Sequence, residues 1–352
     1  MSDIVVSAGC LDDRSSGYGV LTAGQDLYFG HFKASKLKRL GADMDPESAV
    51  EELVEPLRAD RLSGASVLSR TAADVLRRAA VRLQAGSLEE LQWGLGEVCR
   101  SILDAQPAMA PLVTLIRLVM NALERVDSLE AGRLAAAHAA DEFRQGAEGR
   151  IRAVAAAGAT VLPSGGTVAT ISSSATVQAL LIEEAGPRGV TVLCFESRPM
   201  NEGRLFATAL AKAGVEVRFA VDAATAALVP RCDAVIVGAD SVGDEGVVNK
   251  IGTTALARAA HLAGIPVYVL ADETKMLPVG FPQILDDDRS RAEVWDAPSG
   301  VDVWNRYFEI TGMRSITGVV TETGVLTPAQ TLRKRGDLTL PAGLRAWATG
   351  RM

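Results

Sequence analysis

VIVGADSVGDEGVVNKIGTTALA, residues 235–257, is the stretch that decides the fold class. It starts with a fully apolar strand that ends at Asp240, passes through a glycine-rich loop, and brings Asn249 and Lys250 to the start of a helix near Thr253. An apolar strand followed by an amphipathic helix is the repeating unit of a parallel sheet covered on both faces by helices. Ligands of such sheets bind beyond the C-terminal ends of the strands. Polar residues at those ends are therefore the first candidates for a site.

The same alternation of strands and helices runs through the second half of the chain. Apolar strands are predicted at TVLP with TVATIS, VTVLCFES, EVRFAV, AVIVGAD, PVYVLAD and ITGVVTE. Helices are predicted to begin near Thr176, Gly203, Asp222, Thr253 and Pro328. This alternation predicts a doubly wound, Rossmann-like parallel sheet over residues 151–345.

Residues 46–150 show a helical pattern instead. Apolar residues recur there at three- and four-residue steps, and a last long helix leads into Gly158. Ser48, Ser63 and Ser87 stand at or just before three of these runs, where N-caps are expected. The predicted fold class is therefore α/β, with a helical domain at 46–150, the sheet domain at 151–345, and a short β-rich segment at 1–45.

Composition narrows the classes of function. The chain has 352 residues, of which 48% are hydrophobic and 22% charged, as is ordinary for a globular protein, and its net charge of −7 disfavours broad nucleic-acid binding. We see neither a signal peptide nor a run long enough to span a bilayer, so we expect a cytoplasmic protein with no membrane partner. The four cysteines form no CxxC pair and no GxGxxG turn is present, so we expect no metal and no nicotinamide or flavin cofactor.

The first polar cluster is TISSSATV, residues 170–177, at the junction of a strand and a helix. The hydroxyls of Ser172, Ser173 and Ser174 would meet free backbone N–H groups there, an arrangement that favours a bound phosphate. The alternative is serine capping of the helix with no ligand.

The second cluster is FESRPMNEGR, residues 195–204. Arg198 and Arg204 follow a strand and offer guanidinium forks for phosphate oxygens, the alternative being surface ion pairs with Glu196 or Glu202.

The third and fourth clusters are the 235–257 stretch and LADETKML, residues 270–277. A carboxylate at the mouth of a sheet is partly desolvated, which suits Asp240 for general acid or base work, while Lys250 would steady a phosphate or an oxyanion. A structural Asp–Lys pair is the alternative. Lys275 would add a positive contact, the alternative being a solvated loop lysine. Together the clusters predict a cleft for a small anionic molecule such as a phosphorylated sugar.

ESRPMNEGR, VGADSVGDEGVVNKIGT, YVLADETK and VWNRYFEITGMRSITGVVTETGVL resemble the shared motifs of one superfamily. It contains the alpha, beta and delta subunits of translation initiation factor 2B, 5-methylthioribose-1-phosphate isomerase and ribose-1,5-bisphosphate isomerase. The resemblance covers roughly residues 48–330. It includes RLSGASVLSRTAADVL, similar to the family's N-terminal phosphate loop, which implies ligand contacts by Arg61, Gly64, Ala65 and Ser66.

ADETK resembles the branch of the ribose-1,5-bisphosphate isomerases and the alpha subunit. The resemblance implies conversion of an aldose 1-phosphate to the 2-ketose, with Asp240 as acid and base and with Asn249 and Lys250 holding the substrate. It also places Ser172 where the isomerases carry a cysteine, and Ile171 where a histidine is usual. A serine hydroxyl is a far weaker acid than a thiol, so we expect Ser172 to bind ligand or relay a proton and not to act as a nucleophile. We do not expect Cys194, at the end of the neighbouring strand, to substitute for the missing thiol.

Two functions therefore stay open. One is a phosphosugar isomerase, and the other is a non-catalytic protein that binds a sugar phosphate or nucleotide, as regulatory subunits of initiation factor 2B do. For either, the resemblance implies a homodimer or a higher homo-oligomer.

The first 45 residues contain SGYGVL followed by DLYFGHF, similar to the aromatic motifs of cold-shock domains. Such rings stack on nucleic-acid bases. The stacking candidates are Tyr18, Tyr28, Phe29, His31 and Phe32. The alternative is a small β-hairpin packed on the helical domain, since the segment is too short for a complete barrel. Any nucleic-acid contact is expected only through this segment.

Overall fold

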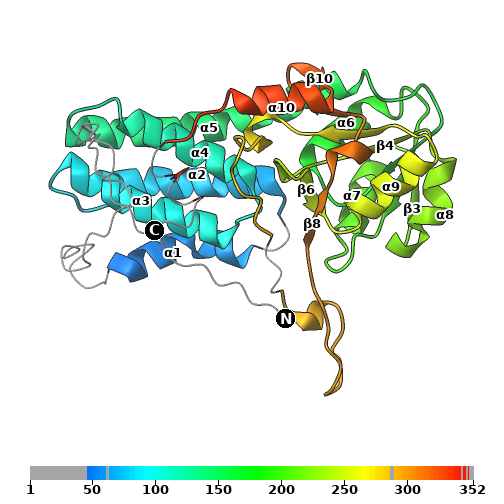
Figure 1. The fold of residues 1–352 in the computed structure, drawn as a ribbon, viewed down its shortest axis with the longest axis horizontal. Coiled ribbons are helices and arrows are strands. Elements are labelled where there is room, and N and C mark those ends of the chain that lie inside the picture. Colours follow the sequence, from blue (N-terminus) through cyan, green and yellow to red (C-terminus); the bar gives the residue numbers. More distant parts are fainter. Residues whose placement is uncertain (1–45, 61–62, 286–288, 342–343, 346–347, 349–352) are drawn as a thin grey trace, which may run out of the picture.

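The computed structural model describes residues 46–60, 63–285, 289–341, 344–345 and 348. The predicted β-rich segment 1–45 and Arg61 lie outside the described residues. Figure 1 shows a bundle of helices at one end of the molecule and a sheet flanked by helices at the other. This is the predicted α/β architecture.

The bundle consists of α1 (Pro46–Ala59), α2 (Ala65–Arg82), α3 (Leu88–Ala105), α4 (Ala110–Leu123) and α5 (Leu129–Gly158). Its core is built from the apolar faces that the periodicity predicted, with residues such as Leu76, Leu95 and Ile116 fully buried. Among the described helices α5 is the longest, and it packs along α2 and α4 in the bundle and along α6 (Ala175–Glu184) of the sheet lobe.

Only one of the three predicted N-caps of the bundle is correct. Ser87 accepts a hydrogen bond from the Glu90 N–H and caps α3. Ser48 lies inside α1, which begins at Pro46 because the fixed φ of proline suits the first helical turn. Ser63 precedes Gly64, which is the N-cap residue of α2.

Seven strands form the main sheet in the order β10-β9-β7-β4-β1-β2-β3. All neighbouring pairs are parallel except β9 with β10. The strands are β1 (Thr167–Thr170), β2 (Thr191–Phe195), β3 (Val217–Ala220), β4 (Ala234–Val237), β7 (Val267–Leu270), β9 (Gly318–Thr321) and β10 (Gly324–Leu326). The strand expected at TVLP is wrong, because the N–H groups of Thr160 and Val161 bond back to Ala157 and Gly158 and end α5 in a turn.

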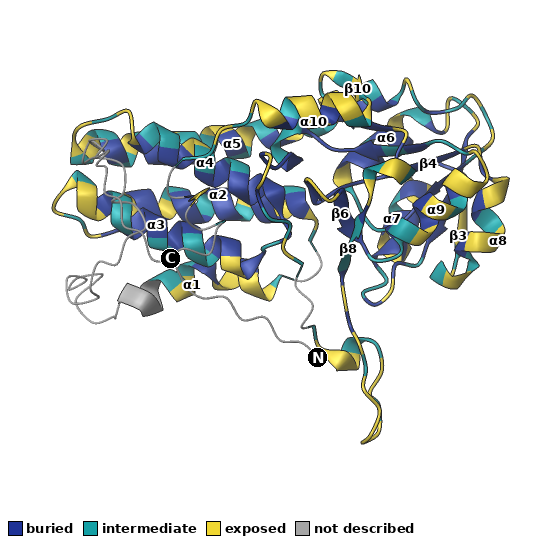
Figure 2. Cartoon of the chain, in the orientation of Figure 1, coloured by how far each residue is buried: buried dark blue, intermediate teal, exposed yellow. Residues whose placement is uncertain are grey.

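Both faces of the sheet are covered, as the apolar strands predicted. Ala169 and Val235 point into one apolar core, and their neighbours Val168 and Ile236 into another. Figure 2 shows the strands buried between helices that are exposed on their outer faces. The covering helices include α6, α7 (Glu202–Lys212), α9 (Thr253–Leu262) and α10 (Pro328–Gly336), each beginning within one residue of its predicted start. Near Asp222 a 3₁₀ turn, Asp222–Ala224, precedes the short α8 (Thr225–Leu228).

A second, antiparallel sheet contains β5 (Ser241–Val242), β6 (Val247–Lys250) and β8 (Phe308–Thr311). β5 and β6 form where the sequence predicted a glycine-rich loop. Gly246 turns the chain at φ +143°, a conformation that L side chains rarely adopt. Val247 and Val248 are then buried in β6 against β8, so Asn249 and Lys250 end a strand and lie just before α9.

The predicted boundary at residue 150 falls inside α5, and the division into domains stays a prediction. Within the described residues, no helix is both long and apolar enough to cross a membrane.

Candidate functional site

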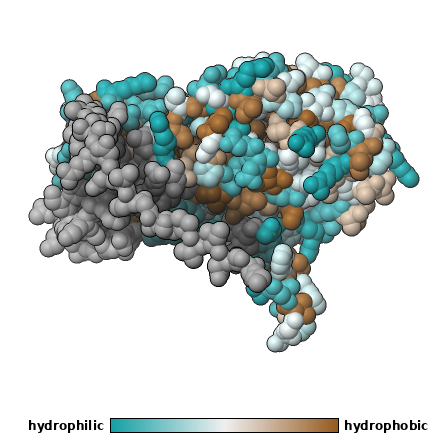
Figure 3. Space-filling view, in the orientation of Figure 1, coloured by the Kyte–Doolittle hydropathy of each residue, from teal (hydrophilic) through white to brown (hydrophobic). Residues whose placement is uncertain are grey.

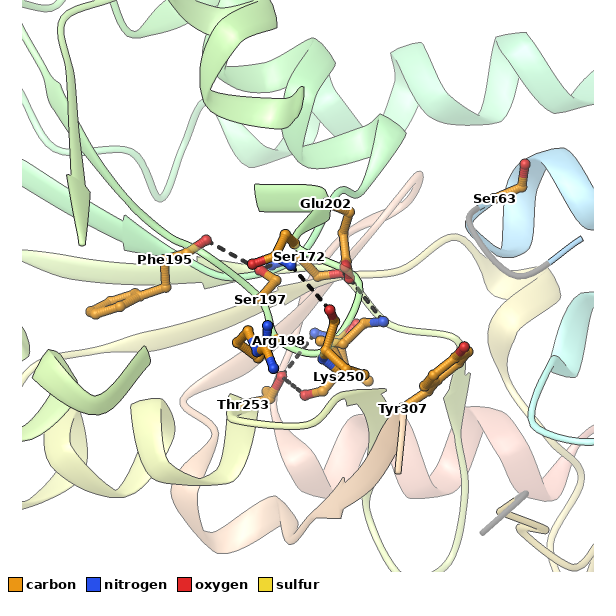
Figure 4. Close-up of polar contacts among 12 residues, drawn as sticks. Ser63, Ser172, Phe195, Ser197, Arg198, Glu202, Lys250, Thr253 and Tyr307 are labelled. Atoms are coloured by element: carbon orange, nitrogen blue, oxygen red, sulfur yellow. Dashed lines mark hydrogen bonds and ion pairs between the residues drawn. The ribbon is translucent and has the colours of Figure 1, made fainter. Parts of the chain in front are cut away.

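The polar side chains that the sequence singled out gather beyond the C-terminal ends of β1, β2, β4 and β7. Figure 4 shows Ser172, Ser197, Glu202, Lys250 and Tyr307 side by side in this region. Ser172 follows β1, Ser197 and Glu202 follow β2, Lys250 ends β6, and Tyr307 lies just before β8.

Ser172 follows β1 in a left-handed conformation, with φ +70°. A residue other than glycine at positive φ is uncommon and needs local support. Its N–H donates to Ser197 Oγ at 2.8 Å, and its own Oγ donates to Glu202 Oε1 at 2.9 Å. Ser197 also lies at positive φ and is fully buried. The backbone is thus held so that the Ser172 hydroxyl faces a carboxylate.

Glu202 and Lys250 form a buried ion pair, with Lys250 Nζ 2.9 Å from Glu202 Oε1. The Lys250 side chain is 7% exposed and the Glu202 side chain is 8% exposed. The ammonium also lies 5.1 Å from the ring centre of Tyr307 and 5.4 Å from that of Phe308, within cation–π range. The second carboxylate oxygen, Oε2, is buried and has no hydrogen-bond partner among the described residues.

Asp240 lies two residues beyond the glycine that follows β4, and it is buried. Burial raises the pKa of its carboxyl group above the ordinary value, and the charge of Glu202 adds to this shift. The charges of Lys275 and Lys250 and a hydrogen bond from the Ala65 N–H act in the opposite direction. The net effect favours a protonated Asp240, which is what a general acid requires.

Lys275 ends the 3₁₀ turn Glu273–Lys275 after β7 and is only 4% exposed. Its positive charge acts on Asp240 and is the largest of the influences that lower the pKa of that carboxyl group. A buried ammonium beside a carboxyl group whose pKa is raised by burial is suited to hold an anionic group of a ligand.

The start of α2 brings the predicted phosphate loop to the same place. Gly64 lies beside the Ser173 carbonyl, since a Cβ at Gly64 would be in ordinary van der Waals contact with that oxygen, at 3.5 Å. Ala65 is buried at the first position of α2, and Ser66 is partly buried beside it. The first N–H groups of a helix lack helical partners, and they favour anions.

Ser174 and Asn249 have structural partners. Ser174 accepts from the Val177 N–H at 3.4 Å and caps α6, which is the capping alternative. Ser173 is partly buried between Ser172 and this cap. Asn249 donates to Thr253 Oγ1 at 3.0 Å, and Thr253 in turn donates to the Lys250 carbonyl at 2.6 Å. Asn249 therefore ties β6 to the start of α9.

The two arginines of the second cluster are exposed. Arg198 donates through Nη2 to the Val294 carbonyl at 2.8 Å. Arg204 has a side chain that is 66% exposed and lies 3.9 Å from the Glu196 carboxylate, which is the ion pair weighed as the alternative. Their contact with phosphate stays a prediction.

Sequence reasoning missed Glu202 as a member of the site and treated it only as an ion-pair partner for arginine. Its position at the start of the helix that follows β2 was the available signal, because the connection from a strand end to the next helix is where ligands of such sheets bind. Cys194 is buried in β2, and burial raises the pKa of its thiol to about 12, so it is a poor source of thiolate. Within the described residues, no three His, Cys, Asp or Glu side chains are grouped to hold a metal ion.

Comparison with protein families matches residues 61–328 to the Initiation factor 2 subunit family. Ribose 1,5-bisphosphate isomerase of Methanocaldococcus jannaschii is 28% identical over 81% of this chain and 94% of its own. The enzyme of the same name from Archaeoglobus fulgidus is 31% identical over 79% and 90%. A protein of Pyrococcus furiosus named for translation initiation factor eIF-2B subunit 2 is 32% identical over 81% and 98%.

Solved structures show the same fold. The translation initiation factor eIF-2B of Pyrococcus horikoshii matches with a TM-score of 0.71 and 27% identity, over 81% of this chain and 98% of its own. The 5-methylthioribose 1-phosphate isomerase of that organism matches with a TM-score of 0.62 and 25% identity, over 82% and 88%. A chain of the tetrameric eIF2B beta2-delta2 complex of Chaetomium thermophilum has a TM-score of 0.67 at 20% identity, over 84% and 96%.

Proposed function

Because the chain belongs to the Initiation factor 2 subunit family, we propose that it is a sugar-phosphate isomerase. The substrate is an aldose 1-phosphate of the ribose 1,5-bisphosphate type, and the product is the 2-ketose. The observation that carries this proposal is Asp240, a buried carboxyl group with a raised pKa beside Lys275 and the start of α2. Relatives named ribose 1,5-bisphosphate isomerase support the reaction class.

In this proposal Asp240 acts as the general acid. Opening the sugar ring requires a proton on the ring oxygen as its bond to C1 breaks, and a protonated carboxyl group supplies it. Lys275 and the Ser66 N–H at the start of α2 hold a phosphate close to Asp240, with Gly64 and Ala65 as the adjoining backbone of that phosphate loop. Arg198 and Arg204 are the proposed contacts of a second phosphate.

A second function, ligand binding without turnover, is favoured by Ser172. The family resemblance implies a thiol at this position, and the serine hydroxyl is already engaged with Glu202. Such a protein would bind a sugar phosphate or nucleotide as a regulator, and relatives named for initiation factor 2B support that reading.

A phosphorus NMR time course separates the two functions. The purified protein is incubated with ribose 1,5-bisphosphate and then with other aldose 1-phosphates, and Asp240→Asn is the control. If the protein is an isomerase, the signal of the anomeric phosphate is expected to disappear while that of a ketose phosphate grows. Asp240→Asn is expected to leave the anomeric phosphate signal unchanged. Shifted or broadened ligand signals without any product across the panel would refute the isomerase and favour the binding protein.

We also propose a homodimer. The segment of residues 289–306 extends away from the body of the molecule (Figures 1 and 3). It carries Trp295 and Trp304, which are 55% and 78% exposed, and aromatic residues are enriched in protein interfaces. Sedimentation equilibrium is expected to give twice the chain mass. A monomer mass at all concentrations would contradict the dimer.

A further inference from the structure

Only one of the two oxygens of the Glu202 carboxylate has hydrogen-bond partners among the described residues. Oε1 accepts hydrogen bonds from Ser172 Oγ and Lys250 Nζ, each at 2.9 Å. Oε2 is buried and has no partner among the described residues. Burying a carboxylate oxygen without a hydrogen-bond donor costs free energy, because its hydration is lost and nothing replaces it. We therefore expect a bound ligand to supply the missing donor. A sugar hydroxyl is a donor of the right kind.

The carboxylate is also fixed in place. Glu202 is the first residue of α7, and Gly203 behind it packs so tightly that a Cβ would lie 1.9 Å from the Phe195 carbonyl oxygen. This contact holds the helix start against the end of β2. With the backbone fixed and Oε1 bound to two donors from other segments, Oε2 has one preferred direction.

Asp240 and Glu202 form a pair of carboxyl groups in contrasting surroundings. Burial favours the protonated form of Asp240, whereas Glu202 accepts from an ammonium and a hydroxyl group. Two carboxyl groups whose surroundings differ in this way commonly divide the roles of acid and base. Lys250 and Lys275 are the other charged groups whose fields reach Asp240.

We infer that Glu202 is a catalytic base of this site and that Ser172 is the residue that positions it. The inference rests on the proposed isomerase function. Asp240 gives a proton to the ring oxygen as the bond from that oxygen to C1 breaks. The hydrogen on C2 moves with its electron pair to C1, and Glu202 Oε2 takes the proton of the C2 hydroxyl, which becomes the ketone. One proton is given and one is taken, and exchange with water returns it from Glu202 to Asp240.

This assignment gives Ser172 a role that needs no thiol. Its hydroxyl is the donor that orients Glu202, and it does not touch the reacting atoms. Ser172→Ala is therefore expected to lower kcat by about tenfold, the value of one hydrogen bond. Glu202→Gln is expected to lower kcat by about 10²–10⁴-fold, the range for loss of a general base.

The test measures turnover of ribose 1,5-bisphosphate, or of whichever aldose 1-phosphate the panel identifies, against pH. The proteins are the wild type, Glu202→Gln, Ser172→Ala and a control, Glu183→Gln, which changes an exposed glutamate on α6. The wild type and the control are expected to show kcat/KM rising with pH at the acidic side and falling at the basic side. Glu202→Gln is expected to lose the rising limb, a change that a merely structural role would not produce.

Thermal unfolding and ligand-binding titration of each variant accompany the kinetics. Glu202→Gln with a native unfolding transition, bound substrate and wild-type kcat would overturn the inference and leave the isomerase intact. If Glu202→Gln lowered kcat but kept both the rising and the falling limb of kcat/KM against pH, the inference would also be overturned. Glu202 would then affect turnover only by holding the structure of the site. A wild type without turnover on any substrate of the panel would refute the proposed function itself, and the inference with it.

Discussion

The backbone N–H of Ala65, at the first position of α2, donates a hydrogen bond to the carboxylate of Asp240 beyond β4. The Ala110 N–H, at the start of α4, donates to the Asp240 carbonyl at 3.1 Å. The first N–H groups of two helices of the bundle, α2 and α4, therefore bond to Asp240, the residue that we propose as the acid. The bundle completes the site because neither donor comes from the sheet lobe.

Ala65→Pro removes the N–H that bonds to the carboxylate and leaves a residue that the first helical position accepts. Loss of this hydrogen bond, which lowers the pKa of Asp240, is expected to raise that pKa further. The falling limb of kcat/KM should then move to higher pH. Ala65→Gly keeps the N–H and is the matched control, and an equal displacement in both variants would contradict the assignment.

Asp240→Asn is expected to abolish turnover and to stabilise the fold. Burial raises the pKa of Asp240 in the folded protein. The stability that this carboxyl group contributes is therefore fully present below its unfolded pKa of about 3.9. That contribution is lost as pH rises through the pKa of Asp240 in the folded protein. At pH 7 the neutral amide avoids this loss and should add about 1 kcal/mol to the free energy of unfolding. Urea unfolding at pH 7 and at pH 4 checks the sign, since the gain should shrink at the lower pH. A variant less stable than the wild type at pH 7 would count against it.

Gly203→Ala is expected to destabilise the protein by about 2–4 kcal/mol, because the new methyl group would overlap the Phe195 carbonyl oxygen, 1.9 Å from the Cβ position. Gly149 of α5 has no atom within 4 Å of its Cβ position. Gly149→Ala should therefore stabilise the helix by about 0.5–1 kcal/mol. Thermal unfolding of the two variants should give shifts of opposite sign, and shifts of the same sign would show that the contact at Gly203 is easily relieved.

Arg335 of α10 is 2% exposed and donates to the Leu277 carbonyl at 2.7 Å and to Asp244 Oδ1 at 2.6 Å. Arg335→Met is expected to cost about 3 kcal/mol, because it leaves a buried carbonyl without its donor. Arg333→Met, at an exposed position of the same helix, should change stability by less than about 0.5 kcal/mol. Chemical denaturation of the two variants measures this difference.

The ion pair between Arg335 and Asp244 also predicts that the stability of the protein falls at acidic pH. Burial opposes ionisation of Asp244, but hydrogen bonds from Arg335 and from the Gly280 N–H outweigh it and hold the pKa of Asp244 below its ordinary value. A depressed folded-state pKa contributes stability above the unfolded value of about 3.9, and that contribution is lost as pH falls through the folded value. Asp244→Asn should lose stability at pH 7 and approach the wild type as pH falls through the folded pKa of Asp244. A constant difference across this range would argue against the ionised contact.

Much of the fold and part of the site could be predicted from the sequence because the signals are local. Apolar strands and helix starts near Gly203, Thr253 and Pro328 follow from periodicity and capping preferences within a few residues. Asp240 and Lys275 were expected near one another because parallel strands end at a common edge. The antiparallel pairing of β6 with β8 was not predicted, since β8 lies far along the chain and no local pattern names a strand's partner.

The sequence by itself determined the class of architecture, the helix starts and the edge of the sheet where polar residues gather, because each depends on short-range geometry. Only the tertiary structure decided which of those residues meet. Ser172, Glu202 and Lys250 come from three separate segments, and their hydrogen bonds exist because the chain packs the loop after β1, the start of α7 and the end of β6 against one another. It also left Arg204 exposed and Glu202 buried on the same helix. Burial and charge at a site depend on what packs around each group, and that information is absent from any single stretch of the chain.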